Sequence, residues 1–548
     1  MTSQYWQRFS RRRVSRRTVL GAGAAGLGAA ALGLAACGDG DETDGGKTPS
    51  AGTPNAGTAK PGGVLRQGSI ATALSIDPHT EAALGLAFVP FIYGYLMHEV
   101  QVPDGPPEML YDHAESMELP DNLTYIFKMR QGIRFQDLPP VNGRAVDASD
   151  VVYSFDRITS VSPEPLWTQY AESKSAPDPA TVQVRLKQPY AYTVEDMGSP
   201  KAAIVPKEAV EQFGDLKTNG IGSGPFTVKS FTSSDKMEMV RNPNYYVEGI
   251  PYLDGLEYRT IVDESALRVA FRGRQFDVYT PPTKTQADEV AGYGSDVVLV
   301  KEPGLLVTKM GINELSRPEL GDVRVREAID IAVDRDAIID KLAFGDGNYT
   351  GPVSWGLTFW SLPQDELRQR FKRDVTKARQ LLEAAGASDI TLELKFPTNT
   401  STDVCVLIQG QAAEAGININ LSGQEFGTWY ADRSARNYEL IVGGGLPYPT
   451  EKYPLQFNYT TDWTRDSIPV HPPLPEIDGL LDQVMATPDP NERQKLVLEV
   501  TRKLLDRHGP ILYLYAPYTY TARWTYVRGY DNVPSGRWGY TYDMWLDK

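Results

Sequence analysis

The spacing of apolar residues is strand-like in the first third of the chain. Residues 122–135 alternate between apolar and polar, with Tyr125, Phe127 and Met129 on one face and a turn at Gly132. Successive side chains of a strand point to opposite sides, so this alternation predicts strands with one face buried.

Helical spacing begins after acidic residues at several places. Asp147 and Asp150 predict a helix start, because a carboxylate there can accept hydrogen bonds from the first free backbone N–H groups. The apolar residues that follow at helical spacing are Val151, Val152, Phe155 and Ile158. Asp263, Asp322 and Asp334 begin further predicted helices in the same way.

Strand and helix patterns alternate in the second half of the chain. The predicted elements are a strand over 390–396, a helix containing Cys405, a strand over 416–421, a helix over 491–508 and a strand over 511–515. Residues 297–311 are mostly apolar and are predicted to pass in extended form into a new lobe. This alternation favours an α/β domain.

Residues 1–36 have the pattern of an export signal. Arg16 and Arg17 precede residues 21–36, which consist only of Gly, Ala and Leu. That run is too short and too rich in glycine for a permanent membrane helix, so it predicts a signal peptide. The paired arginines favour export by the twin-arginine route.

Cys37 ends a Leu-Ala-Ala-Cys segment that resembles the lipobox of bacterial lipoproteins. The resemblance implies that Cys37 is acylated, and each buried methylene of an acyl chain contributes about 0.8 kcal/mol to membrane binding. An ordinary signal peptide is the alternative. Residues 37–61 are rich in Gly, Thr, Pro and acidic residues and are predicted to be a flexible linker. The expected location is extracytoplasmic, anchored to the cell membrane.

Composition limits the possible partners. The formal charge is −15, and it falls to −21 when the signal, with six arginines and no acidic residue, is removed. Such an acidic protein is unsuited to nucleic-acid binding, which needs Lys and Arg against phosphates. With Cys37 acylated, Cys405 has no disulfide partner, and its apolar neighbours predict a buried thiol. The chain is long enough for two or more lobes.

Several short motifs occur in a fixed order. They are Gly62-Gly63-x-Leu65, residues 124–135, residues 147–158, the GSGPF segment at 222–226, residues 241–246, residues 322–339 and the helix after Pro490. Together they resemble the extracytoplasmic solute-binding proteins of ABC importers, often called family 5. This family includes dipeptide- and oligopeptide-binding proteins.

The resemblance implies an α/β fold of two lobes, the type II periplasmic-binding-protein clamshell. Lobe one would comprise residues 62–300 and 513–548, with an extra subdomain inserted at about 91–205. Lobe two would comprise residues 301–512. A peptide or small-molecule ligand would bind between the lobes of a monomer, and the membrane permease of the importer would recognise the closed form.

One segment departs from the pattern of the peptide binders. Many of them carry an acidic residue after a Trp, where it pairs with the amino terminus of the peptide. Residues 441–449 contain neither Trp nor Asp, and Glu451 is the nearest acid. A desolvated ammonium group needs an opposite charge. A peptide is the predicted ligand, while an oligosaccharide, an opine or another polar solute stays open.

Aromatic and hydroxyl side chains are the candidate ligand contacts, because aromatic faces supply contact area while OH and NH groups supply hydrogen bonds. The candidates are Ser69, Thr72, Trp355, Trp429, Tyr448, Tyr513 and Tyr515. Trp429 stands where the family often has a cleft tryptophan, and core packing is the alternative for it. A position in a solvent-facing loop is the alternative for Tyr448.

Signs of catalysis are absent from the sequence. The five histidines show no pair at metal-ligand spacing, and HExxH, CxxC, GxxxxGK[ST] and GxSxG motifs do not occur. Neighbouring carboxylates are expected to lie on a solvated surface in so acidic a chain. An exported glycoside hydrolase, with two carboxylates roughly 5–10 Å apart, is the enzyme alternative, without a positive sign in the sequence. No cofactor, metal or catalytic residue is predicted.

Overall fold

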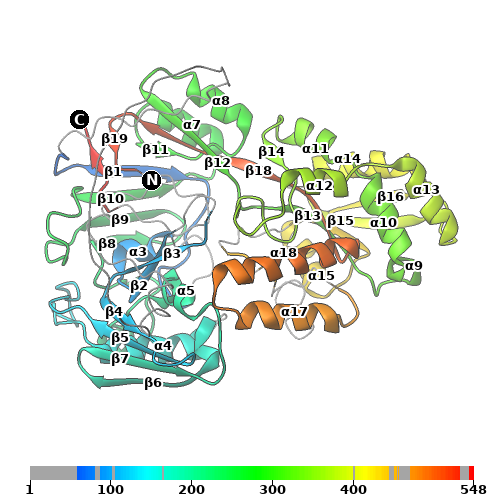
Figure 1. Ribbon diagram of the computed structural model, residues 1–548. Coiled ribbons are helices and arrows are strands. Elements are labelled where there is room, and N and C mark those ends of the chain that lie inside the picture. Colours follow the sequence, from blue (N-terminus) through cyan, green and yellow to red (C-terminus); the bar gives the residue numbers. More distant parts are fainter. Residues whose placement is uncertain are drawn as a thin grey trace, which may run out of the picture.

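The computed structural model describes residues 59–80, 87–100, 105–162, 166–398, 401–443, 450–452, 454–455, 470–530 and 542–548. The predicted signal peptide, Cys37, most of the predicted linker and Tyr448 lie outside the described residues. Within these ranges, we find no helix with the length and hydrophobicity that crossing a bilayer requires. The described chain forms two lobes, and the long strand β18 (Ile511–Trp524) passes from one to the other (Figure 1).

The sheet of the first lobe has the strand order β8-β9-β10-β1-β11-β18. Strand β1 pairs in parallel with β10 along its whole length, while β9 is antiparallel to both β8 and β10. Helix α7 begins after Asp263, as predicted, and packs Leu267 and Phe271 into the lobe. The elements are β1 (Val64–Ser69), β8 (Phe226–Thr232), β9 (Lys236–Arg241), β10 (Gly255–Thr260), α7 (Glu264–Arg272), β11 (Val278–Tyr279), α8 (Lys284–Ala291) and β12 (Val297–Pro303).

A separate four-stranded sheet of order β4-β5-β7-β6 forms the inserted subdomain of the first lobe. Its buried strand faces follow the predicted alternation, with Phe127 of β5 fully buried. The elements here are α3 (Val89–Ile92), β2 (Met97–Val100), β3 (Glu108–Tyr111), β4 (Ala114–Glu118), β5 (Thr124–Met129), α4 (Ala148–Val161), β6 (Ala171–Asp178), β7 (Thr181–Leu186), α5 (Thr193–Met197) and α6 (Lys207–Phe213).

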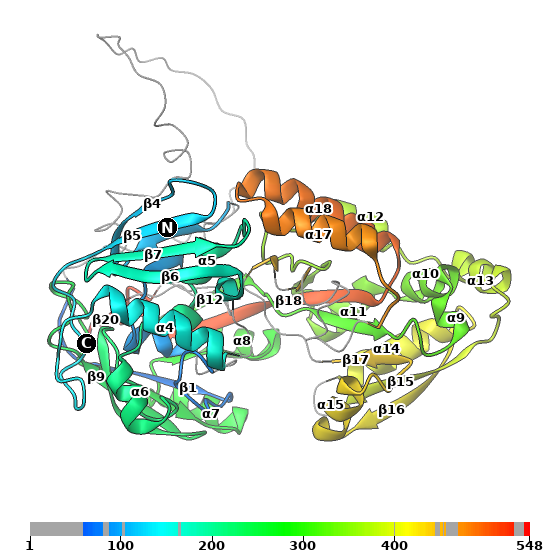
Figure 2. The ribbon, with the colours of Figure 1, turned by 90° about the horizontal axis from the view of Figure 1, so that it is seen from below.

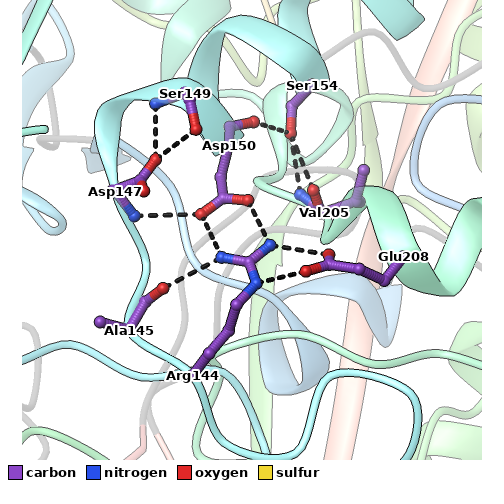
Figure 3. A network of polar contacts seen from close by, with 8 residues as sticks. All are labelled: Arg144, Ala145, Asp147, Ser149, Asp150, Ser154, Val205 and Glu208. Atoms are coloured by element: carbon purple, nitrogen blue, oxygen red, sulfur yellow. Dashed lines mark hydrogen bonds and ion pairs between the residues drawn. The ribbon is translucent and has the colours of Figure 1, made fainter.

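Helix α4 begins with the predicted acidic cap. The Asp147 carboxylate accepts a hydrogen bond from the Ser149 N–H, while Asp150 accepts one from the Asp147 N–H, a reciprocal capping box (Figure 3). Arg144 donates to both Asp150 and Glu208, so its guanidinium joins the start of α4 to α6. The cap predicted from local sequence is thereby also a tertiary contact.

The second lobe contains the sheet β16-β15-β17-β13-β18. Apolar residues of these strands and of α10, α13 and α14 form its core, including Met310, Leu392, Leu440 and Leu512. The elements are β13 (Thr308–Ile312), α10 (Val323–Ala332), α11 (Arg335–Leu342), β14 (Gly347–Asn348), α12 (Gln364–Arg370), α13 (Val375–Ala384), β15 (Thr391–Pro397), α14 (Thr402–Ala413), β16 (Asn418–Gln424), α15 (Phe426–Ser434) and β17 (Leu440–Val442).

Cys405 is buried in the core of this lobe, as predicted. Its side chain on α14 is inaccessible to solvent, and burial raises the pKa of the thiol to about 12. A thiol with so high a pKa forms little thiolate at neutral pH and is a poor nucleophile.

A helical hairpin, α17 (Pro475–Ala486) and α18 (Pro490–Asp506), packs along the second lobe and extends toward the first (Figures 1 and 2). Its base belongs to the second lobe, because the Glu314 N–H donates to the Val470 carbonyl just before α17 and Arg502 pairs with Glu366 of α12. The predicted helix over 491–508 corresponds to α18.

The lobes are linked where β18 changes partners. Its first part pairs with β13 of the second lobe, and its second part pairs with β12 of the first lobe. Gly304, directly after β12, lies so close to β18 that an added Cβ would be 2.1 Å from the Pro517 carbonyl oxygen. The predicted strand over 511–515 is therefore only the first half of a strand that serves both lobes.

Candidate functional site

Three of the predicted site residues gather where β18 crosses between the lobes. Tyr513 and Tyr515 lie on β18 opposite Lys309 and Thr308 of β13. The Trp355 indole N–H donates to the Ala516 carbonyl at 3.2 Å, next to Tyr515. Trp355 and Tyr513 are almost fully buried and Tyr515 is half-buried, so Tyr515 keeps the most accessible surface of the three.

Charged residues surround this crossing. Asp346, just before β14, accepts hydrogen bonds from Lys301 of β12 and from the Tyr520 hydroxyl of β18. Partial burial opposes the charged form of Asp346, but these two donors outweigh it and lower its pKa. Lys301 also lies 4.0 Å from the ring centre of Tyr518, so cation, carboxylate and aromatic faces meet at the junction.

Trp429 is fully buried on α15, beneath the end of β17. A Cβ added to Gly443 would be 3.3 Å from its ring, so the indole lies directly against the backbone of Gly443. Its indole N–H has no hydrogen-bond partner among the described residues. Phe426 and Tyr430 on the same helix are about half exposed and stack on each other with ring centres 6.2 Å apart. Ligand contact by Trp429 stays a prediction.

Ser69 is the last residue of β1 in the first lobe, and Thr72 follows shortly after it. The Ser69 hydroxyl accepts a hydrogen bond from the Ala71 N–H at 3.0 Å, which closes a local turn. The Tyr258 hydroxyl donates to the Ala71 carbonyl and holds the same turn from β10. Thr72 is exposed. Neither hydroxyl is joined to Trp355, Tyr513 or Tyr515 by a hydrogen bond in the described structure.

Sequence reasoning missed a buried set of charges next to the glycine-rich segment 443–449. Glu451, Lys452 and Arg493 are each almost inaccessible, as are Glu195 and Asp196 of α5. We expected neighbouring carboxylates to lie on a solvated surface, and for the Glu195-Asp196 pair this expectation is wrong. The paired residues lie 298 positions apart in the case of Arg493 and Glu195, so no local pattern could have indicated the contact.

The histidines are also less scattered than their sequence positions suggest. His98 Nε2 lies 2.9 Å from one Asp112 oxygen, and His113 Nδ1 lies 3.3 Å from the other. The second ring nitrogen of His113 is 2.8 Å from the Ser223 hydroxyl. Among the described residues, no group of three or more His, Cys, Asp or Glu has the arrangement of a metal site.

This Asp112, His113 and Ser223 series has the order of contacts found in serine hydrolases, but its surroundings are structural. Ser223 is 1% exposed, and a Cβ added to Gly94 would lie 2.7 Å from its hydroxyl oxygen. A nucleophile must come within reach of a substrate carbonyl and a set of oxyanion donors. Ser223 is almost inaccessible to solvent, so in this structure the series is a buried polar network.

Comparison with known families identifies the chain. Residues 108–465 match the description "Bacterial extracellular solute-binding proteins, family 5 Middle", which is more than half of the chain. The chain belongs to this family. The motif series along the sequence had indicated the same family, so that prediction is confirmed.

Relatives of this family-5 chain include glutathione-binding proteins. GsiB of Salmonella typhi is 28% identical over 315 residues, which cover 56% of this chain and 59% of that protein. GsiB of Escherichia coli O1:K1 is 27% identical over 405 residues, covering 70% of this chain and 76% of that protein. The chain therefore matches somewhat over half the length of the Salmonella relative.

Solved structures similar to this chain share its two-lobed fold. DppA of Helicobacter pylori, in complex with the peptide STSA, has a TM-score of 0.74 and 22% identity, with coverage of 89% of this chain and 99% of DppA. AgaA of A. tumefacien R10, in complex with agropinic acid, has a TM-score of 0.69 and 24% identity, with coverage of 86% and 95%. The predicted type II clamshell fold is confirmed.

Proposed function

We propose that this family-5 protein captures a peptide between its lobes and delivers it to the permease of an ABC importer. Membership of the solute-binding family carries the proposal. A ligand that contacts both lobes favours the closed arrangement by its higher affinity for that arrangement, which is how binding becomes a signal to a permease. Similar folds occur in DppA with a bound peptide and in AppA of Bacillus subtilis with a nonapeptide.

A non-peptide polar solute is the second candidate, and the state of Glu451 favours it. Arg493 lies 3.3 Å from Glu451, and the Tyr192 hydroxyl donates to the same carboxylate at 2.9 Å. A carboxylate already paired and buried is poorly placed to receive the ammonium group of a peptide. The fold of AgaA, which binds agropinic acid, accommodates such a solute.

For the ligand contacts we propose the aromatic group at the crossing, with Tyr515 as the most accessible member, and Trp429, whose ring lies against Gly443. Tyr448, Ser69 and Thr72 complete the proposed set. Tyrosine and tryptophan suit a site that accepts varied solutes, because they combine large apolar faces with a few directional hydrogen bonds.

We further propose that the protein is exported by the twin-arginine route and held at the membrane by acylated Cys37, with residues 37–61 as linker. The sequence around Cys37 and the extracellular character of the family support this. The proposed protein is a monomer without catalytic activity or cofactor. Its proposed lobe boundaries, near residues 300 and 513, lie within β12 and within the first part of β18.

Calorimetry on the purified protein tests the function. The titrants are a panel of di- to nonapeptides, glutathione, opines and oligosaccharides, and mass spectrometry examines each solute after binding. We expect one class to bind at 1:1 stoichiometry and to be recovered intact. Recovery of a cleaved solute would establish an enzyme instead, and native mass spectrometry of the freshly purified protein would identify a solute that co-purifies.

A further inference from the structure

The tip of the helical hairpin meets the inserted subdomain in a second junction, away from the β-strand crossing. The Ala191 N–H, just before α5, donates to the Met485 carbonyl of α17 at 2.7 Å. Figures 1 and 2 both show α5 of the first lobe at the end of this hairpin. Any movement that separates the lobes here must break this contact.

Buried ion pairs cross the same junction. Arg493, at the start of α18, donates to Glu195 of α5 at 2.9 Å, and Lys452 donates to Asp196. The Tyr190 and Tyr192 hydroxyls of the subdomain add hydrogen bonds to this set. In each ion pair the cation comes from the second lobe and the carboxylate from the inserted subdomain of the first lobe. The two ion pairs therefore exist only while the junction is closed.

Arg493 is also held between rings from the two lobes. Its guanidinium carbon lies 4.4 Å from the ring centre of Tyr192 and 5.1 Å from that of Trp360. The side chain is fully buried, and its other guanidinium nitrogen donates to the Thr487 and Pro488 carbonyls of the hairpin turn. Arg493 is thus fixed to the hairpin on one side and reaches the subdomain on the other.

We propose that this ion-pair network is a reversible latch that holds the inserted subdomain against the hairpin of the second lobe in the absence of ligand. The physical reason is the balance of buried charge. Burying two ions costs solvation that their mutual attraction only partly returns, whereas separating them into water restores the solvation. A charged junction therefore opens more readily than an apolar junction of the same size, while remaining specific when closed.

Burial disfavours the charged form of the carboxylates in this network, which fits a contact that can open. Glu195 and Glu451 both lie within ion-pair distance of Arg493, and Asp196 lies within ion-pair distance of Lys452. Burial raises the pKa of Glu451 and of Asp196, despite their cationic partners. The desolvation that raises these two pKa values also makes the closed form less favourable than an apolar contact would be.

Amide-resolved hydrogen exchange on the ligand-free full-length protein tests the latch independently of any transported solute. The reporter is the Ala191 N–H, which bonds across the junction. The reference is the Met129 N–H, which bonds to the Ala180 carbonyl within the subdomain at 2.8 Å. In the wild type we expect Ala191 to exchange faster than Met129. Equal rates would mean that only global unfolding breaks the contact, and the proposal would fail.

Variants separate a latch from a general stabilising contact. Asp196→Asn removes the ion pair that Asp196 makes with Lys452 across the junction, and breaking a buried ion pair from one side is destabilising, so we expect Ala191 exchange to accelerate at least tenfold with Met129 unchanged. The double variant Asp196→Leu/Lys452→Met removes both charges and should return Ala191 to the wild-type rate or below. Glu366→Gln is the control. It removes the ion pair between Glu366 of α12 and Arg502 of α18, which lies within the second lobe, and it should leave the exchange rates of both amides unchanged.

The outcomes are decisive in either direction. Unchanged Ala191 exchange in folded Asp196→Asn, or equal acceleration of Met129, would overturn the proposal. Should Asp196→Asn fail to fold, Arg493→Lys serves in its place, because it keeps the charge but loses the fork that reaches Glu195 and Glu451. An Ala191 rate that Arg493→Lys leaves unaltered would overturn the proposal equally.

Discussion

Asp112 shows how strongly the surroundings of one residue set its chemistry. Its carboxylate is buried, which by itself disfavours the charged form, yet His113 and His98 outweigh burial and hold its pKa well below the usual range. The Tyr95 N–H also donates to it at 2.9 Å. A group whose pKa is lower in the folded than in the unfolded protein stabilises the fold above its unfolded pKa, and that stability is lost as pH falls toward the folded pKa.

We predict that Asp112→Asn flattens the acid side of the stability curve. Below about pH 4 the free energy of unfolding should fall as the pH decreases. For each pH unit, the fall in the wild type should exceed that in the variant by about 1.4 kcal/mol, because the wild type takes up one extra proton on unfolding. Urea denaturation between pH 2 and 6 measures this difference. Parallel curves for the two proteins would contradict it.

Trp429 provides a second prediction at this scale. Trp429→Ala should lower the free energy of unfolding by about 3–5 kcal/mol, because the ring is fully buried and its loss leaves a cavity. Tyr430→Ala is the matched control on the same helix, since Tyr430 is 53% exposed and should change stability by less than about 0.5 kcal/mol. Chemical denaturation followed by circular dichroism distinguishes them, and a stable Trp429→Ala protein with weakened solute binding would make Trp429 a contact residue alone.

At the scale of secondary-structure elements, β12 and β18 control how the lobes are joined. β18 is antiparallel to β12 in one lobe and to β13 in the other, so the same strand belongs to both sheets. Gly304 allows the close approach at the change of partner, because any side chain would meet the Pro517 carbonyl.

Gly304→Ala should destabilise the protein by about 1–3 kcal/mol, since the added methyl group forces the strands apart. Gly410→Ala is the control, because a Cβ at this position on α14 meets nothing within 4 Å and alanine favours a helix by up to about 1 kcal/mol. Thermal unfolding of both variants measures this difference in stability. Equal stability of the two would show that the crossing tolerates a side chain.

The whole molecule is an acidic chain that folds into two lobes and carries a predicted lipoprotein signal peptide. Tethering by Cys37 would keep the binding domain near the permease, at a local concentration that the length of linker 37–61 sets. Cys405, the other cysteine, is buried in the second lobe and unavailable for acylation.

We therefore predict that Cys37→Ser moves the exported protein from the membrane fraction to the soluble fraction. Cys405→Ala should leave it in the membrane fraction. Fractionation of cells that express each variant, with detection of the bound acyl chain by mass spectrometry of the wild type, measures this. Membrane retention of Cys37→Ser would show that another feature of the protein anchors it.

The sequence by itself determined the elements and the family. The caps at Asp147, Asp322 and Asp334 and the alternation around Phe127 are local features, and the structure reproduces each because hydrogen bonds within a turn and the burial of one face need no distant partner. The order of the motifs along the chain also indicated the two-lobed fold, through the resemblance to the family.

Tertiary structure alone decided which charges meet. Arg493 joins Glu195 from 298 residues away, and His113 joins Ser223 from 110 residues away, at positions where nothing in the local pattern marks a partner. The sequence also did not decide whether Trp429 is buried under Gly443, because a tryptophan suits a core and a binding site alike. These contacts depend on how lobes and helices approach one another, and that approach is set by the packing of whole elements.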